Sequence, residues 1–244
     1  MQYNSMIFIV NNLRPVASNQ HSTMLHKTRG VVFRFIKYRD TSIIVTIFTE
    51  VFGLQSYIVN GVRSKTAKNK IALYQPLTLL DLVVYHRENV NLLRIKEAKC
   101  LHPYQTIQYD IRKSAIAMFL IEIVNKAIKD ESHSDVLCEF LINSFIALDQ
   151  VTTVENFHLI FLLKLSRYLG FGPQTNDEVL DGWPLSQEEE LVLKKLLHAN
   201  FDALIAVNQF SRRNLLETLI RFYTVHIENF GEVKSLPVLK EMFT

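Results

Sequence analysis

The sequence predicts an α+β protein in which a small N-terminal β-barrel is followed by an all-helical bundle. Of its 244 residues, 48% are hydrophobic, which provides enough apolar surface for a substantial core. Residues 27–100 are rich in β-branched and aromatic residues, grouped in short runs between turn-forming residues. After Pro103 the apolar residues follow the spacing of buried helices instead.

The first segment, residues 1–23, shows no sustained period and runs into a second methionine, Met24. We expect a loosely ordered extension, or the result of a start codon assigned too early. The apolar run MIFIV within it is too short for a membrane span and lacks the basic flank of a signal peptide. No other apolar run approaches the length of a span, so we expect a cytoplasmic protein without a membrane segment.

Residues 24–102 are predicted to form the barrel domain. Turn-forming pairs such as Asn60-Gly61 separate five runs with strand character, namely GVVFRFIKY, TSIIVTIFT, LQSYIVN, LTLLDLVVYH and VNLLRIKEAKC. Five strands at this spacing fit a five-stranded Greek-key barrel of the OB-fold type, whose open face commonly binds single-stranded nucleic acid. An SH3-like barrel fits the pattern equally well.

Residues 103–244 are predicted to form the helical domain. The run 110–130 is apolar over most of its circumference, as expected of a helix buried between neighbours. Two later helices are predicted to begin with capping boxes, and Gly170 suits the left-handed position after the first of them. The boxes are Thr152 with Glu155 and Ser186 with Glu189, and the runs 134–149 and 211–230 complete the bundle.

Basic residues are concentrated in the barrel region. The whole chain has a net charge of +3, yet residues 27–70 contain nine Lys/Arg against two acids. Two sets stand out, one on and beyond the first strand and one in the connection NGVRSKTAKNK: Arg34, Lys37 and Arg39, and Arg63, Lys65, Lys68 and Lys70. A barrel could bring both sets together, which points to a polyanionic partner. A solubilising loop is the alternative.

Aromatic residues alternate with these cations and could stack on bases if they point outward. They are Phe33, Phe35, Tyr38 and Tyr57. We expect most of them in the core, because a barrel this small has few other residues with which to fill its interior.

Catalytic and metal-binding patterns are not found. The eight histidines form no HxxxH or His/Cys pair, and His158 is expected to be a buried core histidine. Cys100 and Cys138 are expected to be reduced core thiols. The GFG at 170–172 follows a helix rather than a strand and lacks the lysine of a phosphate loop, so it fits a helix C-cap. We therefore expect no enzyme, no cofactor and no metal.

Four stretches, in the same order and spacing, resemble the RecO family of bacterial recombination mediators over residues 24–173. They are KTRGVVFRFIKYRDTSIIVTIFTEVFGLQSYIVNGVRSK, YQPLTLLDLVVYH, RIKEAKCLHPYQTIQYDIRKSA and NFHLIFLLKLSRYLGFGP. The resemblance implies an OB-fold followed by a helical domain. It also implies binding of single- and double-stranded DNA, strand annealing, association with RecR, and recognition of the acidic C-terminal tail of single-stranded-DNA-binding protein, in a nucleoid-associated role that helps to load recombinase.

The candidate sites follow from this resemblance together with the charge pattern. The two basic sets are the candidate DNA contacts. The candidates for the peptide tail are cations on otherwise apolar helices: Arg112, Lys113, Lys164 and Arg167.

The chain departs from the family in two places. Residues 174–190 contain no cysteine where many members carry a four-cysteine zinc module, so a zinc site is not carried over. In the second strand, Ser42 and Ile43 replace an acidic and a basic residue. The family's KGxR pattern is matched at Gly61 and Arg63, with Asn60 in place of the lysine.

An OB-fold RNA-binding or scaffold protein is the alternative function, and a nuclease is a third.

Overall fold

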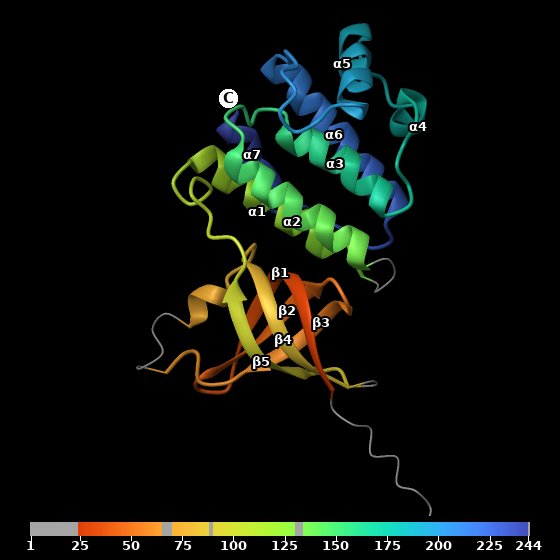
Figure 1. The fold of residues 1–244 in the computed structure, drawn as a ribbon. Coiled ribbons are helices and arrows are strands. Elements are labelled where there is room, and N and C mark those ends of the chain that lie inside the picture. Colours follow the sequence, from red (N-terminus) through yellow and green to blue (C-terminus); the bar gives the residue numbers. More distant parts are fainter. Residues whose placement is uncertain (1–23, 65–69, 88–89, 130–133, 244) are drawn as a thin grey trace, which may run out of the picture.

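The computed structural model describes residues 24–64, 70–87, 90–129 and 134–243. A β-barrel forms one end of the molecule and a layered set of helices forms the other (Figure 1). The prediction for residues 1–23 lies outside the described residues.

The barrel is closed and its strands follow the order β1-β2-β3-β5-β4. All neighbouring strands are antiparallel except β3 and β5, which are parallel. The strands are β1 Met24–Tyr38, β2 Ser42–Thr49, β3 Gly53–Val59, β4 Leu79–His86 and β5 Leu93–Cys100, and a short 3₁₀ helix, η1, spans Ile71–Tyr74. This arrangement confirms the predicted fold class, with the OB-fold as the barrel type.

The long first strand closes the barrel because it pairs with two neighbours. Its first half pairs with β4 and its second half with β2, and the register shifts between Val32 and Arg34. Gly30 lies where both pairings meet, and a Cβ atom there would stand only 2.8 Å from Ile47 Cγ2. A glycine is therefore required for β1 to approach β2 this closely.

The helical domain contains seven helices within the described residues. They are α1 Ile111–Ala127, α2 Ser134–Gln150, α3 Phe157–Tyr168, α4 Asn176–Leu180, α5 Gln187–Leu197, α6 Gln209–His226 and α7 Leu236–Met242. The capping box of Ser186 and Glu189 is confirmed at the start of α5. Gly170 has φ +86° just after α3, as predicted.

The other predicted capping box is wrong. Helix α3 begins at Phe157 with Asn156 in the N-cap position, four residues beyond Thr152. Glu155 instead forms an ion pair with Arg112 at 3.2 Å. The helices α4 and α7 were not predicted, because each is too short to show a clear hydrophobic period.

The barrel and the helices share one hydrophobic core. Val31, Phe33, Phe48 and Leu79 come from the strands but belong to the same buried cluster as the helices. The rings of Phe33 and Phe48 stack with their centroids 5.7 Å apart. A separate buried cluster fills the barrel interior. The layer shared by barrel and helices is therefore an extension of the helical core onto one end of the barrel.

Polar contacts fix the two halves around this layer. Arg29 on β1 binds Glu50, in the β2–β3 turn, at 2.6 Å and Glu139 on α2 at 2.5 Å. The amide of Asn125 on α1 donates to the Phe33 carbonyl at 3.2 Å. The ion pair of Arg29 with Glu139 and the neutral hydrogen bond of Asn125 thus both join the barrel to the helices.

The segment between barrel and helices is anchored by a buried carboxylate. Asp149, 3% exposed, accepts the backbone N–H groups of Gln105, Thr106 and Ile107 at 2.8–3.1 Å. Burial alone would raise the pKa of this carboxyl, but the three N–H groups outweigh it and lower the pKa to about 2. Asp149 therefore stays ionised and orders the turn that leads into α1.

The cysteines differ from each other. Cys138 is buried, and burial raises the pKa of its thiol to about 12, as expected of an inert core thiol. Cys100 is also a free thiol, but its predicted position in the core is wrong, because it is exposed at the end of β5. Within the described ranges, no three His, Cys, Asp or Glu side chains are grouped so that they could hold a metal ion. In the same ranges, no helix combines the length and apolar character that crossing a membrane requires.

Candidate nucleic-acid interface and peptide groove

The barrel brings the two predicted basic sets into contact at one end. The backbone N–H of Arg63 donates to the Thr41 carbonyl at 3.0 Å, and its guanidinium donates to the Arg39 carbonyl at 3.1 Å. Arg39 lies in the β1–β2 turn with φ 49°, and its guanidinium covers the Tyr38 ring at 5.2 Å from the centroid. Gly61, with φ +73°, allows the chain after β3 to turn towards this contact.

The cations on β1 are exposed and free of acidic partners. Arg34 and Lys37 are exposed, and neither forms an ion pair within the part of the chain that the structure describes. Arg29, on the same strand, is held by two carboxylates instead. Arg34 and Lys37 are therefore exposed cations, unpaired among the described residues, on the second half of β1, the half that pairs with β2.

The second basic set is only partly described. Lys70 is exposed at the start of η1, in the same connection as Arg63. Lys65 and Lys68 lie outside the described residues, so their positions stay predictions.

The predicted aromatic set divides between core and surface. Tyr57 and Phe33 are buried, and Phe35 packs against the barrel core. Tyr38 is half-exposed beneath Arg39. The core interpretation is confirmed for Phe33 and Tyr57, and Tyr38 is the member that a ligand could reach.

Two further exposed cations were not among the predicted DNA contacts, because they lie outside the basic region of the sequence. Arg94 and Lys96 are exposed on β5, whose first residues pair with β3. The alternation of Arg94 and Lys96 in LRIKEAKC marks a solvent-facing side of a strand. Only the strand order, which places β5 next to β3, shows that this side continues the face made by β1, β2 and β3.

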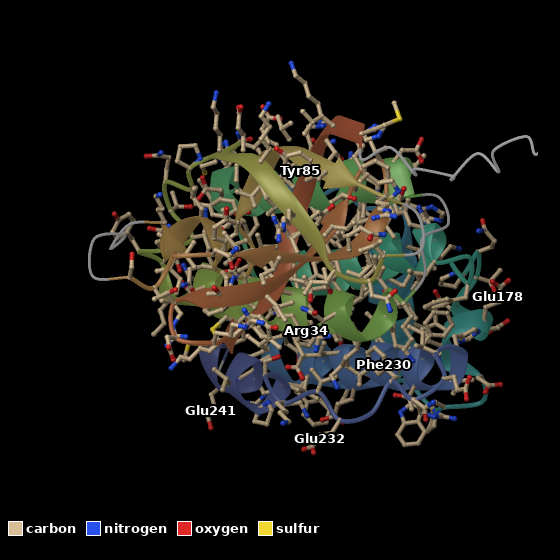
Figure 2. The ribbon with its side chains drawn as sticks, turned by 90° about the horizontal axis from the view of Figure 1, so that it is seen from below. Arg34, Tyr85, Glu178, Phe230, Glu232 and Glu241 are labelled. Atoms are coloured by element: carbon tan, nitrogen blue, oxygen red, sulfur yellow. The ribbon has the colours of Figure 1, made fainter. Side chains whose placement is uncertain are left out.

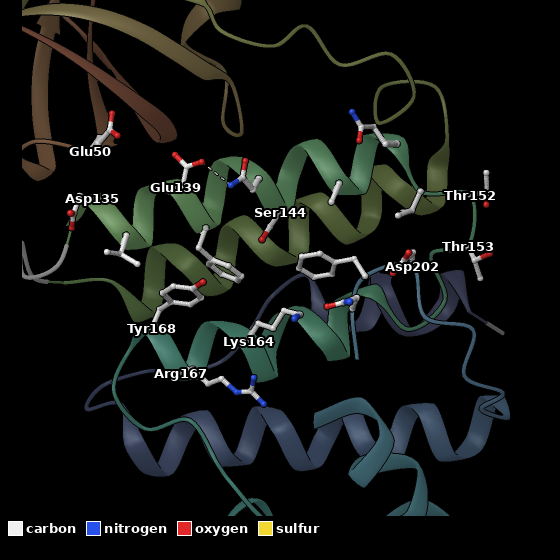
Figure 3. Close-up of a pocket in the computed structure, with 18 of the residues that line it drawn as sticks. Glu50, Asp135, Glu139, Ser144, Thr152, Thr153, Lys164, Arg167, Tyr168 and Asp202 are labelled. Atoms are coloured by element: carbon white, nitrogen blue, oxygen red, sulfur yellow. Dashed lines mark hydrogen bonds between the residues drawn. The ribbon is translucent and has the colours of Figure 1, made fainter. Parts of the chain in front are cut away.

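A groove with a volume of ≈ 1540 Å³ runs between α2 and α3. Phe140 from α2 and Tyr168 from α3 both line it, and their rings stack across the groove with centroids 4.3 Å apart. Figure 3 shows Lys164 and Arg167 on α3, with Asp135 and Glu139 on the facing α2 near Glu50. Lys164 and Arg167 thus lie on α3, on the same helix as Tyr168. Three acids lie towards the barrel, and a fourth, Asp202, lies towards the other end of the groove.

Both predicted cations of α3 line this groove. The ammonium of Lys164 lies 5.7 Å from the centre of the Phe201 ring, and Arg167 donates to the Leu197 carbonyl. Burial, and then the neighbouring charge of Arg167, lower the pKa of Lys164. An anion in the groove would relieve this repulsion.

Ser144 adds a polar group that the sequence did not reveal. It lines the groove from α2, is 1% exposed, and its hydroxyl has no hydrogen-bond partner among the described residues. A buried hydroxyl without a partner is costly, and a ligand in the groove could supply one.

The predicted cations of α1 lie elsewhere. Arg112 is paired with Glu155, and Lys113 is 5% exposed, with its ammonium donating to Thr106 Oγ1 and to the Asp149 carbonyl at 2.7 and 2.8 Å. Neither residue lines the groove. Lys113 therefore stabilises the segment before α1, and we do not keep it as a peptide contact.

Comparison with known proteins gives consistent matches along the chain. The family model "Recombination protein O N terminal" matches residues 24–104, and "Recombination protein O C terminal" matches residues 108–188. Three relatives bear the name DNA repair protein RecO. The Bacteroides fragilis protein is 38% identical over 90% of this chain and 100% of its own length. The Flavobacterium johnsoniae protein is 38% identical over 89% and 99%, and the Phocaeicola vulgatus protein 36% over 91% and 100%.

Proposed function

This chain belongs to the RecO family of DNA repair proteins, and on that premise we propose that it is a non-enzymatic mediator that binds single- and double-stranded DNA and anneals complementary strands. The observation that carries the proposal is the set of exposed cations without acidic partners at one end of the barrel, where Arg39 and Arg63 meet. Such cations neutralise phosphates without reading the sequence.

Annealing requires no catalytic side chain in this proposal. Two DNA strands repel each other through their phosphates, and a basic surface that holds both lowers this repulsion. Because the phosphates are bound and the base edges stay free, complementary bases can pair while the protein is attached.

The helical domain is proposed to bind protein partners. We assign the acidic C-terminal tail of single-stranded-DNA-binding protein to the α2–α3 groove, because Lys164 and Arg167 offer charge beside the stacked rings of Phe140 and Tyr168. The unpartnered hydroxyl of Ser144 supports the same assignment. With RecR as a second partner, the protein would help to load recombinase onto coated single strands.

The test measures how DNA affinity depends on salt. Replacing Arg63, Lys65, Lys68 and Lys70 with alanine should lower the slope of log affinity against log salt by up to about 3, from roughly 0.7 per phosphate contact on single strands. The matched control replaces Lys194 and Lys195, exposed lysines on α5, and should leave the slope unchanged. An unaltered slope in the first variant would move the DNA site to Arg34, Lys37 and Arg39.

Three parallel measurements separate the alternatives. Tighter binding to matched RNA than to single-stranded DNA in the same salt would favour the RNA-binding function. Cleavage of DNA in the presence of magnesium or manganese would contradict a non-enzymatic mediator. A pull-down of single-stranded-DNA-binding protein with and without its last residues tests the tail.

A further inference from the structure

A row of five side chains crosses the outside of the barrel. Ile36 on β1 lies opposite Ile44 on β2, and Ile44 lies opposite Ile58 on β3. Ile58 in turn lies opposite Arg94 on β5, and Arg94 lies opposite Tyr85 on β4. We call these five residues the outer row. Four strand intervals of about 4.8 Å give the row a length of about 19 Å around the barrel.

The outer row faces away from the barrel interior. Its direct neighbours along the strands, Val45, Tyr57, Leu93 and Val84, are all buried in the barrel core. Successive side chains of a strand point to opposite faces, so the row points outward. Ile36 is 58% exposed.

The helices leave this part of the barrel uncovered. Phe48 lies on the same face of β2 as Ile44, but it is buried against the helices. Ile44 is four residues nearer to the β1–β2 turn and is only half-buried. Figure 2 views the molecule from the barrel end and labels Tyr85 and Arg34 on the strands.

The chemistry of the row combines apolar surface with positive charge. Three adjacent isoleucines form an apolar strip, a feature that soluble proteins expose mainly at binding sites, and the Tyr85 ring stands apart from it on the far side of Arg94. Arg94 lies between Ile58 and Tyr85, and Arg34 lies two residues from Ile36 on the same strand. Within the described residues, the side chains of Arg34, Arg94 and Tyr85 form no ion pair or hydrogen bond with the rest of the chain.

We propose that the outer row binds the bases of single-stranded DNA, while the cations around it hold the phosphates. This inference rests on the proposed function and adds a base-contacting surface to it. An unpaired strand offers flat apolar base faces along a line of phosphates, which matches an apolar strip with unpaired cations at its side. A duplex hides its base faces, so only the phosphate contacts are available to it.

The composition of the row sets how bases are held. Tyr85 is the only ring in the row and is the residue on which a base stacks. The isoleucines contact base faces without hydrogen-bonding to their edges, so they give no preference for one base. Arg94 belongs to the DNA contacts, although it lies outside the basic region of residues 27–70.

The experiment measures the affinity of the wild type and of an outer-row variant for three DNA probes. The probes are an unstructured oligothymidine, an abasic strand of the same length and a duplex. The variant is Ile36→Ser with Ile58→Ser, and the matched control is Ile111→Ser, which makes the same change at a residue on α1 that is 68% exposed. Ile36→Ser alone is measured as well, in case the double variant is poorly folded by circular dichroism.

We expect the variant to lose affinity only for the single strand that carries bases. The wild type should bind oligothymidine at least about fivefold more tightly than the abasic strand, and the row variant should lose this preference. Its affinities for the abasic strand and the duplex, and its salt slope, should not change, because no cation has been removed. Arg94→Gln should instead lower the salt slope by roughly 0.7 on single strands.

Other results would overturn the inference in distinct ways. Equal wild-type affinity for oligothymidine and the abasic strand would remove the base contacts but keep the proposed DNA binding. Loss of RecR association in the row variant, with all DNA affinities unchanged, would assign the row to a protein partner. If the wild type bound none of the three probes, the proposed function itself would fail.

Discussion

Asp149 offers the sharpest test of how the barrel is joined to the helices. The perturbation is Asp149→Asn, which keeps the shape of the side chain but removes the charge that three backbone N–H groups share. The carboxyl pKa falls from 3.8 to about 2 on folding, and each unit corresponds to about 1.36 kcal/mol. The ionised form should therefore contribute about 2 kcal/mol to the free energy of unfolding at pH 7.

The sign of the pH dependence follows from the direction of the shift. Because folding lowers this pKa, the contribution is complete above about pH 5 and is lost as the pH falls through the folded value. About half of it should be lost at pH 3. The difference between wild type and variant should shrink accordingly, since asparagine does not titrate.

The assay is urea unfolding followed by circular dichroism between pH 7 and pH 3. Asp202→Asn is the matched control, because Asp202 is exposed and accepts no hydrogen bond from the rest of the described chain. Ordinary surface substitutions change the free energy of unfolding by no more than about 0.5 kcal/mol. If Asp149→Asn lowered it at pH 7 by an amount within that range of the control, the reasoning would be refuted. A difference that stays constant down to pH 3 would refute it as well.

Three other outcomes are expected. Replacing Lys164 and Arg167 with alanine should weaken binding of an acidic C-terminal peptide at least about tenfold, with DNA affinity kept within about threefold, as measured by fluorescence anisotropy; unchanged peptide affinity would place the tail on another face. Arg29→Met should lower the free energy of unfolding by about 1 kcal/mol through its two partly exposed ion pairs, and a loss no larger than that of Arg34→Met, the same change at an unpaired arginine of β1, would contradict this. The ring resonances of His158 should not move between pH 8 and pH 5 in NMR spectra, because burial lowers its pKa to about 3; movement above pH 5 would contradict its burial.

The barrel could be predicted because its signal is local. Alternating apolar residues and turn pairs such as Asn60-Gly61 mark each strand without knowledge of its neighbours. The capping box at Ser186 was found in the same way. The box at Thr152 failed because Glu155 pairs with Arg112, a residue 43 positions away, and sequence spacing carries no information about such a contact.

The site was less predictable because it depends on which elements become neighbours. Arg94 joins the outer face only through the pairing of β5 with β3. Lys113 was taken for a free cation, yet it is buried against the last turn of α2. Charge along the sequence identifies candidates, and the topology decides which of them share a surface.

The common apolar layer also has a consequence during synthesis. Phe33 and Phe48 belong to the barrel sequence, but the helices that cover them end only at Gln150. At about 5–20 residues per second, the roughly 50 residues after β5 take about 3 to 10 seconds to be translated. For that time the nascent barrel carries an uncovered aromatic face, which is a binding site for a chaperone and a liability for aggregation.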